Sequence, residues 1–160
     1  MVCSFTGHRE IPREHLSSLS DLLKRAVAYA YSEGCRTFCA GGALGFDTLA
    51  AREVILFRMT HPDVSLVLLL PCIDQDKSWG ERQQSDYQFI LKNADSVEYV
   101  SDEYTKGCMK ERNMALAERC DIMIAYVGKP YSGAGQTVRF AERLNKRVYN
   151  LFPSVKASLG

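Results

Sequence analysis

Three apolar runs in this chain end in glycine-containing turns that open into helical patterns. The turns are Thr6-Gly7-His8-Arg9, Gly41-Gly42-Ala43-Leu44-Gly45 and Ser132-Gly133-Ala134-Gly135-Gln136-Thr137. Where a strand passes into a helix, unpaired backbone N–H groups meet the positive end of the helix dipole, and glycine lets an anion approach closely. Three such turns at the same end of successive units favour a ligand that carries phosphate.

The third turn is the best phosphate candidate. Its small residues and hydroxyls stand at a helix start, where backbone N–H groups can hold an anion. A turn that is only capped by its own side chains is the alternative. We assign four of its residues to ligand binding: Ser132, Gly133, Gly135 and Thr137.

The second turn lacks the full G-x-G-x-x-G spacing of a dinucleotide fingerprint and follows the second strand rather than the first. Gly41, Gly42 and Gly45 are compatible both with phosphate contact and with a tight turn that only needs glycine. Asp47 follows in the first helical turn, where it either caps free N–H groups or accepts a hydrogen bond from a ribose hydroxyl, since a carboxylate repels phosphate. All four residues belong to the predicted site.

The first turn combines a hydroxyl, an imidazole and a guanidinium. Arg9 offers a planar fork for phosphate or carboxylate, and its alternative is a surface pair with an acid such as Glu10. His8 either caps the backbone or acts as a general acid or base, which requires an orienting partner that the adjacent sequence does not supply. We include Thr6, Gly7, His8 and Arg9 in the predicted ligand site.

The fourth helical pattern adds one candidate. Asn113 shares an otherwise apolar stripe with Met109 and Leu116, so its amide either ties the strand ends together or reaches the ligand. Lys110 and Arg112 project to different sides of this helix, and one of them is expected to be solvated.

The chain shows no pattern for a metal site or a known nucleophile. His8, His15 and His61 are scattered, the six cysteines match no zinc module, and there is neither a G-x-S-x-G elbow nor a Walker A sequence. We predict no metal and no cofactor, and we assign no catalytic residue.

Composition predicts one domain over residues 1–160, because 46% hydrophobic content suits a single core of this size. Twenty basic and nineteen acidic side chains leave a net charge of +1, so we expect neither nucleic acid nor a membrane as partner. The N-terminus shows no targeting pattern, and the cysteines suit a reducing compartment, which predicts a soluble cytoplasmic protein.

Strand and helix patterns alternate along the whole chain. Near-continuous apolar strands separated by helices predict an α/β fold, a doubly wound three-layer sandwich with a mostly parallel sheet covered on both faces. Ligands in such folds bind beyond the carboxyl ends of the strands, where the three turns lie. We expect strands over 2–6, 36–39, 65–70, 96–100, 122–127 and 147–151, and helices over 13–33, 44–59, 79–93, 107–119 and 135–144.

The joint order of four motifs resembles the YpsA-like branch of the SLOG superfamily, which includes the Lonely Guy phosphoribohydrolases and the Smf/DprA proteins. The motifs are the first turn, Gly41-Gly42-Ala43-x-Gly45-x-Asp47, Lys110-Glu111-Arg112-Asn113, and Ser132-Gly133-x-Gly135-x-Thr137. The resemblance implies a Rossmann-like six-stranded sheet of order 3-2-1-4-5-6, a pocket for a nucleotide or a derivative such as ADP-ribose, and a homodimer. Exposed apolar residues such as Tyr29 and Tyr31 permit self-association.

The match departs from the hydrolase branch. Lonely Guy enzymes share the stretch Pro-Gly-Gly-x-Gly-Thr-x-x-Glu. Depending on the alignment, the position of its glutamate is occupied in this chain by Phe140 or by Arg139, and neither supplies a carboxylate. We therefore predict a binding module for a nucleotide-derived small molecule, a sensor or regulator. The alternative is a phosphoribohydrolase that uses Glu142, Asp47 or Glu111, and single-stranded DNA binding is a weaker third reading that the neutral charge disfavours.

Overall fold

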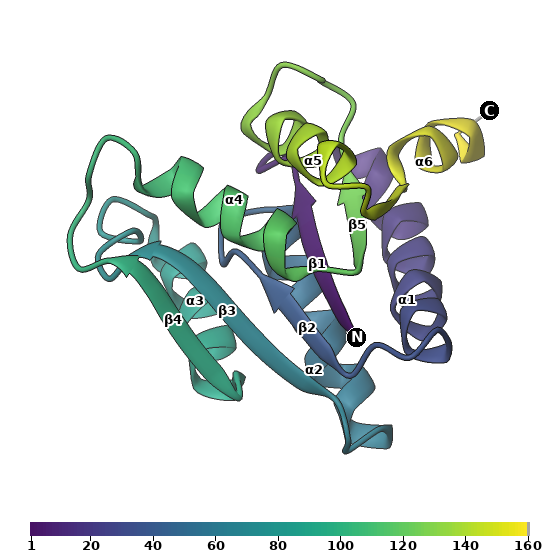
Figure 1. Cartoon of the computed structure of the whole chain (residues 1–160), viewed down its shortest axis with the longest axis horizontal. Helices are drawn as coiled ribbons and strands as arrows, with labels where there is room; N and C mark the ends of the chain where they lie inside the picture. The colour runs from purple at the N-terminus through teal and green to yellow at the C-terminus, as the bar shows by residue number, and fades with distance from the viewer. Residues whose placement is uncertain (160) are drawn as a thin grey trace.

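The computed structural model describes residues 1–159 and contains six strands and six α-helices in alternation (Figure 1). The strands are β1 (Val2–Gly7), β2 (Thr37–Ala40), β3 (Ser65–Cys72), β4 (Ser96–Ser101), β5 (Ile122–Tyr126) and β6 (Arg147–Asn150). The helices are a short 3-10 turn η1 (Arg13–His15), α1 (Leu16–Ser32), α2 (Phe46–Thr60), α3 (Glu81–Asn93), α4 (Cys108–Arg119), α5 (Gly133–Arg143) and α6 (Phe152–Ser158). Every predicted strand and helix is present.

The six strands form one sheet in the order β4-β3-β2-β1-β5-β6, and every pairing is parallel. Helices α4 and α5 cross one face and α1, α2 and α3 cover the other, as Figure 1 shows. The α/β Rossmann-like fold class is confirmed, and so is the predicted order of the first three strands, β3-β2-β1. Strand β4 lies next to β3, whereas the order 3-2-1-4-5-6 places it next to β1. The winding therefore reverses after β4, and β5 pairs with β1.

The core forms because the central strands are apolar on both faces. Leu66, Leu68 and Leu70 of β3 are completely buried against α2 and α3, while Leu69 packs with Leu116 of α4 on the opposite face. No helix within residues 1–159 is both long and apolar enough to cross a membrane.

Helix α6 was not predicted. Its core anchor Val155 is fully buried, Phe152 packs partly buried against the same core, and the helix lies beside α1 (Figure 1). The spacing of Phe152, Val155 and Leu159, with Pro153 in the first turn, is a helical pattern that sequence reasoning could have used.

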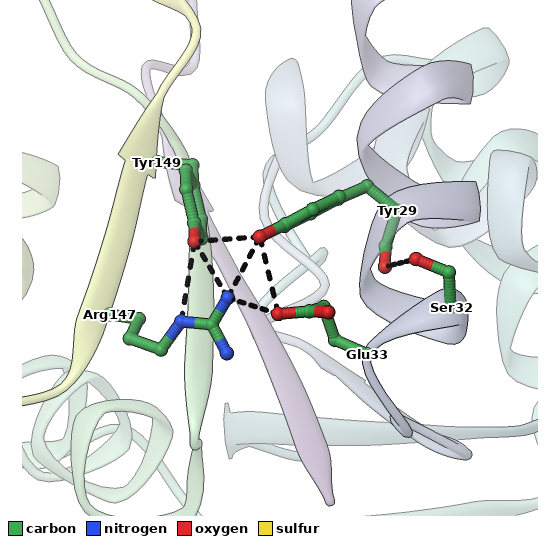
Figure 2. Close-up of polar contacts among 5 residues, drawn as sticks. All are labelled: Tyr29, Ser32, Glu33, Arg147 and Tyr149. Atoms are coloured by element: carbon green, nitrogen blue, oxygen red, sulfur yellow. Dashed lines mark hydrogen bonds and ion pairs between the residues drawn. The ribbon is translucent and has the colours of Figure 1, made fainter.

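The exposed edge strand β6 is tied to α1 by a polar cluster, shown in Figure 2. Arg147 Nη2 donates to Glu33 Oε1 over 2.6 Å and to the hydroxyls of Tyr29 and Tyr149 over 2.8 Å each. The guanidinium lowers the pKa of Glu33 through its hydrogen bond to this carboxylate. Tyr29 is thus engaged within the chain, and Tyr31 likewise donates to Asp63, so the predicted homodimer gains no support from these two rings.

Candidate functional site

A cavity of about 1150 Å³ lies at the carboxyl ends of β1 and β5. The strand ends, the loop after β1, and the starts of α2, α4 and α5 all contribute to it, because the carboxyl ends of parallel strands meet at one rim of the sheet. The predicted residues that line it are Thr6, Gly7, His8, Arg9, Asp47, Asn113, Ser132 and Gly133. The predicted residues that do not line it are Gly41, Gly42, Gly45, Gly135 and Thr137.

The start of α5 presents backbone donors to the cavity. Ser132 is the N-cap and its Oγ accepts from Gly135 N over 3.0 Å. The N–H groups of Gly133 and Ala134, the first two helical residues, have no protein acceptor among residues 1–159, and both residues line the cavity. This helix start therefore has two free amides at the positive end of its dipole.

Gly135 and Thr137 shape this helix start instead of facing a ligand. A Cβ at Gly135 would overlap the carbonyl oxygen of Pro130, so glycine is required for the close approach of the preceding loop. Thr137 is fully buried and its Oγ1 donates to Gly133 O over 2.9 Å. Their assignment to direct ligand contact is corrected to a supporting role for this reason.

The glycines of the second turn also serve packing. Gly45 has φ +76°, and a Cβ there would overlap the carbonyl oxygens of His8 and Arg9, while Phe46 N donates to His8 O over 3.1 Å. Gly42 has φ +68° and its side-chain position is filled by Leu70. This turn therefore holds the loop after β1 against α2, and its glycines do not reach the cavity.

Gly41 instead brings two buried charges together. Its carbonyl oxygen accepts from Arg112 Nη1, and a Cβ on Gly41 would lie 2.7 Å from that nitrogen and 2.8 Å from Asp47 Oδ2. Arg112 is 4% exposed and Asp47 5%, and both line the cavity. The cavity floor thus carries a guanidinium and a carboxyl that the surrounding protein largely shields from bulk water.

The Asp47 carboxyl has one free acceptor. Its Oδ2 accepts from Ala43 N of the preceding loop over 3.3 Å and caps no N–H group of α2, and the buried Oδ1 has no hydrogen-bond partner among residues 1–159. Burial raises the pKa of Asp47 to about 6, opposed by the positive charges of Arg112 and Arg9. A buried oxygen without a donor is costly, which makes Oδ1 a place for a ligand hydroxyl.

Arg112 lines the cavity but is not among the residues that the sequence analysis assigned to the site. Of the two cations predicted to diverge, Lys110 is exposed and Arg112 is buried, with Nε donating to Asn113 Oδ1 over 2.9 Å. Asn113 therefore orients Arg112 and lines the cavity itself. The spacing of Cys108, Arg112 and Leu116, all on the buried face of α4, is the signal that could have identified it.

His8 fastens the loop between β5 and α5. Its Nε2 accepts from Gly128 N over 2.8 Å and from Lys129 N over 3.2 Å. Burial and the nearby charge of Lys129 lower the pKa of His8, which favours the neutral ring that these contacts need. His8 is positioned as a hydrogen-bond acceptor for the loop rather than as a general base.

Acidification is expected to release this loop. Because the folded pKa of His8 lies below the ordinary value of 6.5, its contribution to stability is present above pH 6.5 and is lost as the pH falls through the folded pKa. In an NMR titration from pH 7.5 to 5, the amide signals of Gly128 and Lys129 should shift together with a midpoint below 6.5. A midpoint above 6.5, or no shift in either amide, would contradict this role, and a His8→Phe variant should show no such transition.

The rival carboxylates lie elsewhere. Glu111 and Glu142 are both exposed and neither lines the cavity, so Asp47 is the one member of that trio inside it. Phe140 and Arg139 are also outside the lining. Among residues 1–159, no group of three or more His, Cys, Asp or Glu side chains is arranged to hold a metal ion.

The family model described as the YspA SLOG family, YpsA, matches residues 7–150. The chain belongs to the YpsA-like branch of the SLOG superfamily. A UPF0398 protein of Halalkalibacterium halodurans is 31% identical over 114 residues, covering 69% of this chain and 60% of that protein. The chain thus spans less than two thirds of this relative's length.

Two solved structures show the same fold as this SLOG chain. DNA processing protein A from Helicobacter pylori, described for its single-stranded DNA binding mode, has a TM-score of 0.65 at 19% identity and covers 92% of this chain and 63% of its own. DNA processing protein A from Streptococcus pneumoniae has a TM-score of 0.64 at 15% identity, covering 92% and 49%.

The expectation that excluded nucleic acid is wrong. It rested on the net charge of +1, yet the H. pylori neighbour of this fold binds single-stranded DNA. The net charge averages over the whole surface, whereas the cavity concentrates four cations at one place: Arg9, Arg112, Lys129 and Lys156. Glu10, Glu14 and Asp47 also line it, so the local field is mixed, but a neutral total does not exclude a polyanion.

Proposed function

We propose that this SLOG domain binds a nucleotide-derived small molecule in the cavity, with the phosphate at the start of α5 and the ribose at Asp47. The observation that carries the proposal is the unpartnered, buried Asp47 Oδ1 in a cavity that also holds the free amides of Gly133 and Ala134. An acceptor for a hydroxyl and donors for an anion within one cavity match a ribose phosphate. Arg112 supplies a charged donor to the same ligand.

A sensing or regulatory role in the cytoplasm is part of the same proposal. The cavity offers one buried carboxyl, and the six cysteines are free and buried, which suits a reducing compartment. Of the three carboxylates predicted for a hydrolase, only Asp47 lines the cavity, since Glu111 and Glu142 lie outside it.

Calorimetric titration with ribose 5-phosphate and with AMP tests the proposal. Arg112→Met removes the buried guanidinium and keeps its apolar stem. It should weaken the binding of both ligands by about 10- to 100-fold, which is the contribution of one charge-assisted hydrogen bond to affinity. Lys110→Met, on the exposed side of the same helix, is the matched control and should change neither. Absence of binding by the wild-type chain, or equal effects of the two variants, would refute the site. Free adenine accumulating from AMP would favour the hydrolase.

Single-stranded DNA is the second candidate, favoured by the fold of the H. pylori neighbour and by the four cations of the cavity. An oligodeoxynucleotide that contacts Z of these cations should lose affinity with salt at a logarithmic slope of about −0.7Z. Competition decides between the two ligands. If AMP fails to displace the oligonucleotide, the strand binds outside the cavity.

A further inference from the structure

The cavity extends beyond what a ribose phosphate fills. Its volume of about 1150 Å³ lies above the range of about 300 to 1,000 Å³ that is usual for small-ligand sites. Past Asp47 and the start of α5, its lining continues over the loop after β1, η1 and α6, through Ile11, Pro12, His15 and Phe152. This second end combines apolar and aromatic side chains with the carboxylates of Glu10 and Glu14 and the ammonium of Lys156.

Four rings meet at this end of the cavity. The centroid of Phe152 lies 5.1 Å from that of Tyr126, 5.7 Å from that of His15 and 6.2 Å from that of His8. Tyr126 is fully buried and stacks on Phe46, whereas Phe152 is only partly buried and lines the cavity. Phe152 is therefore a ring that a planar ligand group can reach.

Polar atoms surround this ring. His15 is 5% exposed, and its Nδ1 is hydrogen-bonded to the Tyr126 hydroxyl over 2.6 Å, while its Nε2 has no protein partner among residues 1–159. Lys156 follows Phe152 by one helical turn, so α6 presents a ring and an ammonium to the same cavity. A flat heteroaromatic group has a π-face for the ring and polar edge atoms for His15 and Lys156.

We propose that the aromatic end is the nucleobase subsite, in which the base stacks on Phe152 and its edge is recognised by His15 and Lys156. The inference rests on the proposed function, because it places the base of the same nucleotide whose phosphate lies at α5. It assigns base selection to α6 and η1, two elements that carry none of the four motifs of the family resemblance.

Comparing AMP with ribose 5-phosphate isolates the base. The wild-type chain should bind AMP about 5- to 150-fold more tightly than ribose 5-phosphate, since stacking of one base contributes about 1–3 kcal/mol. Phe152→Leu keeps an apolar side chain against Gly128 but removes the ring. It should weaken the binding of AMP by about tenfold and leave the binding of ribose 5-phosphate unchanged. Phe89→Leu, at a 47% exposed ring of α3 outside the cavity, should change neither.

The outcomes separate the two proposals. Equal affinities of the wild-type chain for both compounds, or an equal loss of both in Phe152→Leu, overturn the base subsite and leave the ribose phosphate site standing. If neither compound binds, both the base subsite and the ribose phosphate site are overturned. If Phe152→Leu does not fold, Phe152→Tyr should keep the preference for AMP and His15→Asn should reduce it, and failure of either expectation overturns the subsite.

Discussion

Asp47→Asn is expected to stabilise the fold at pH 7 and at the same time to remove nucleotide binding. Burial raises the pKa of Asp47 to about 6 from its ordinary value of 3.8, so folding favours the neutral acid. A group whose pKa is raised on folding contributes stability that is present below the unfolded pKa and is lost as the pH rises through the folded pKa. At pH 7 the ionised carboxylate therefore costs about 3 kcal/mol, which a neutral amide avoids.

Urea unfolding of both proteins between pH 4 and pH 8 measures this effect. The free energy of unfolding of the variant should be close to that of the wild-type chain near pH 4 and about 3 kcal/mol higher at pH 7, because the other titrating groups are common to both. Calorimetry with AMP should show a loss of about 10- to 100-fold, since a charged acceptor for the ribose hydroxyl is gone. Asp21→Asn, at an exposed position of α1 outside the cavity, is the control and should alter neither quantity.

A less stable variant at pH 7 would mean that the ionised carboxylate is a structural partner of Arg112. Asp47 would then be retained for the fold and not for a ligand, and the unpaired Oδ1 would lose its significance. A variant that is more stable but no longer binds AMP would instead identify Asp47 as a functional residue, which the fold retains although it lowers stability.

Sequence patterns predicted the features of the fold that depend on residues close together in the chain. The apolar strands, the amphipathic α1 and the collection of glycine turns at one rim follow from periodicity and from the geometry of parallel strands. The capping of α5 by Ser132 likewise depends on neighbours a few residues away.

Helical spacing places Arg112 on the buried face of α4, but it does not show what compensates the buried charge. Arginine is among the residues least often buried, and what compensates its charge here is a carbonyl 71 residues away, at Gly41, together with Asp47. The place of β4 at the sheet edge and the docking of α6 on α1 also depend on contacts between distant segments. From the sequence, the glycines of the turns are expected to leave space for an anion. At Gly45 this space is occupied by backbone atoms of the protein itself.

Gly45→Ala is expected to destabilise the fold by about 3 to 5 kcal/mol. The backbone at Gly45 has φ +76° and ψ −120°, a conformation that residues with a Cβ avoid at a cost of about 1–3 kcal/mol, and the methyl group would also overlap the carbonyl oxygens of His8 and Arg9. The loop after β1 would have to leave α2, which would break the bond from Phe46 N to His8 O and displace one wall of the cavity.

Thermal unfolding should report a fall in Tm of about 10 °C or more, given about 2–4 °C per kcal/mol for a chain of this size. Gly107→Ala provides the comparison, because φ there is −105° and the nearest atom to the added Cβ is Glu111 Oε1 at 4.0 Å, so its Tm should change by no more than about 3 °C. If Gly45→Ala kept the wild-type Tm but no longer bound AMP, the glycine would be serving the ligand directly, and the packing role assigned to the second turn would be wrong.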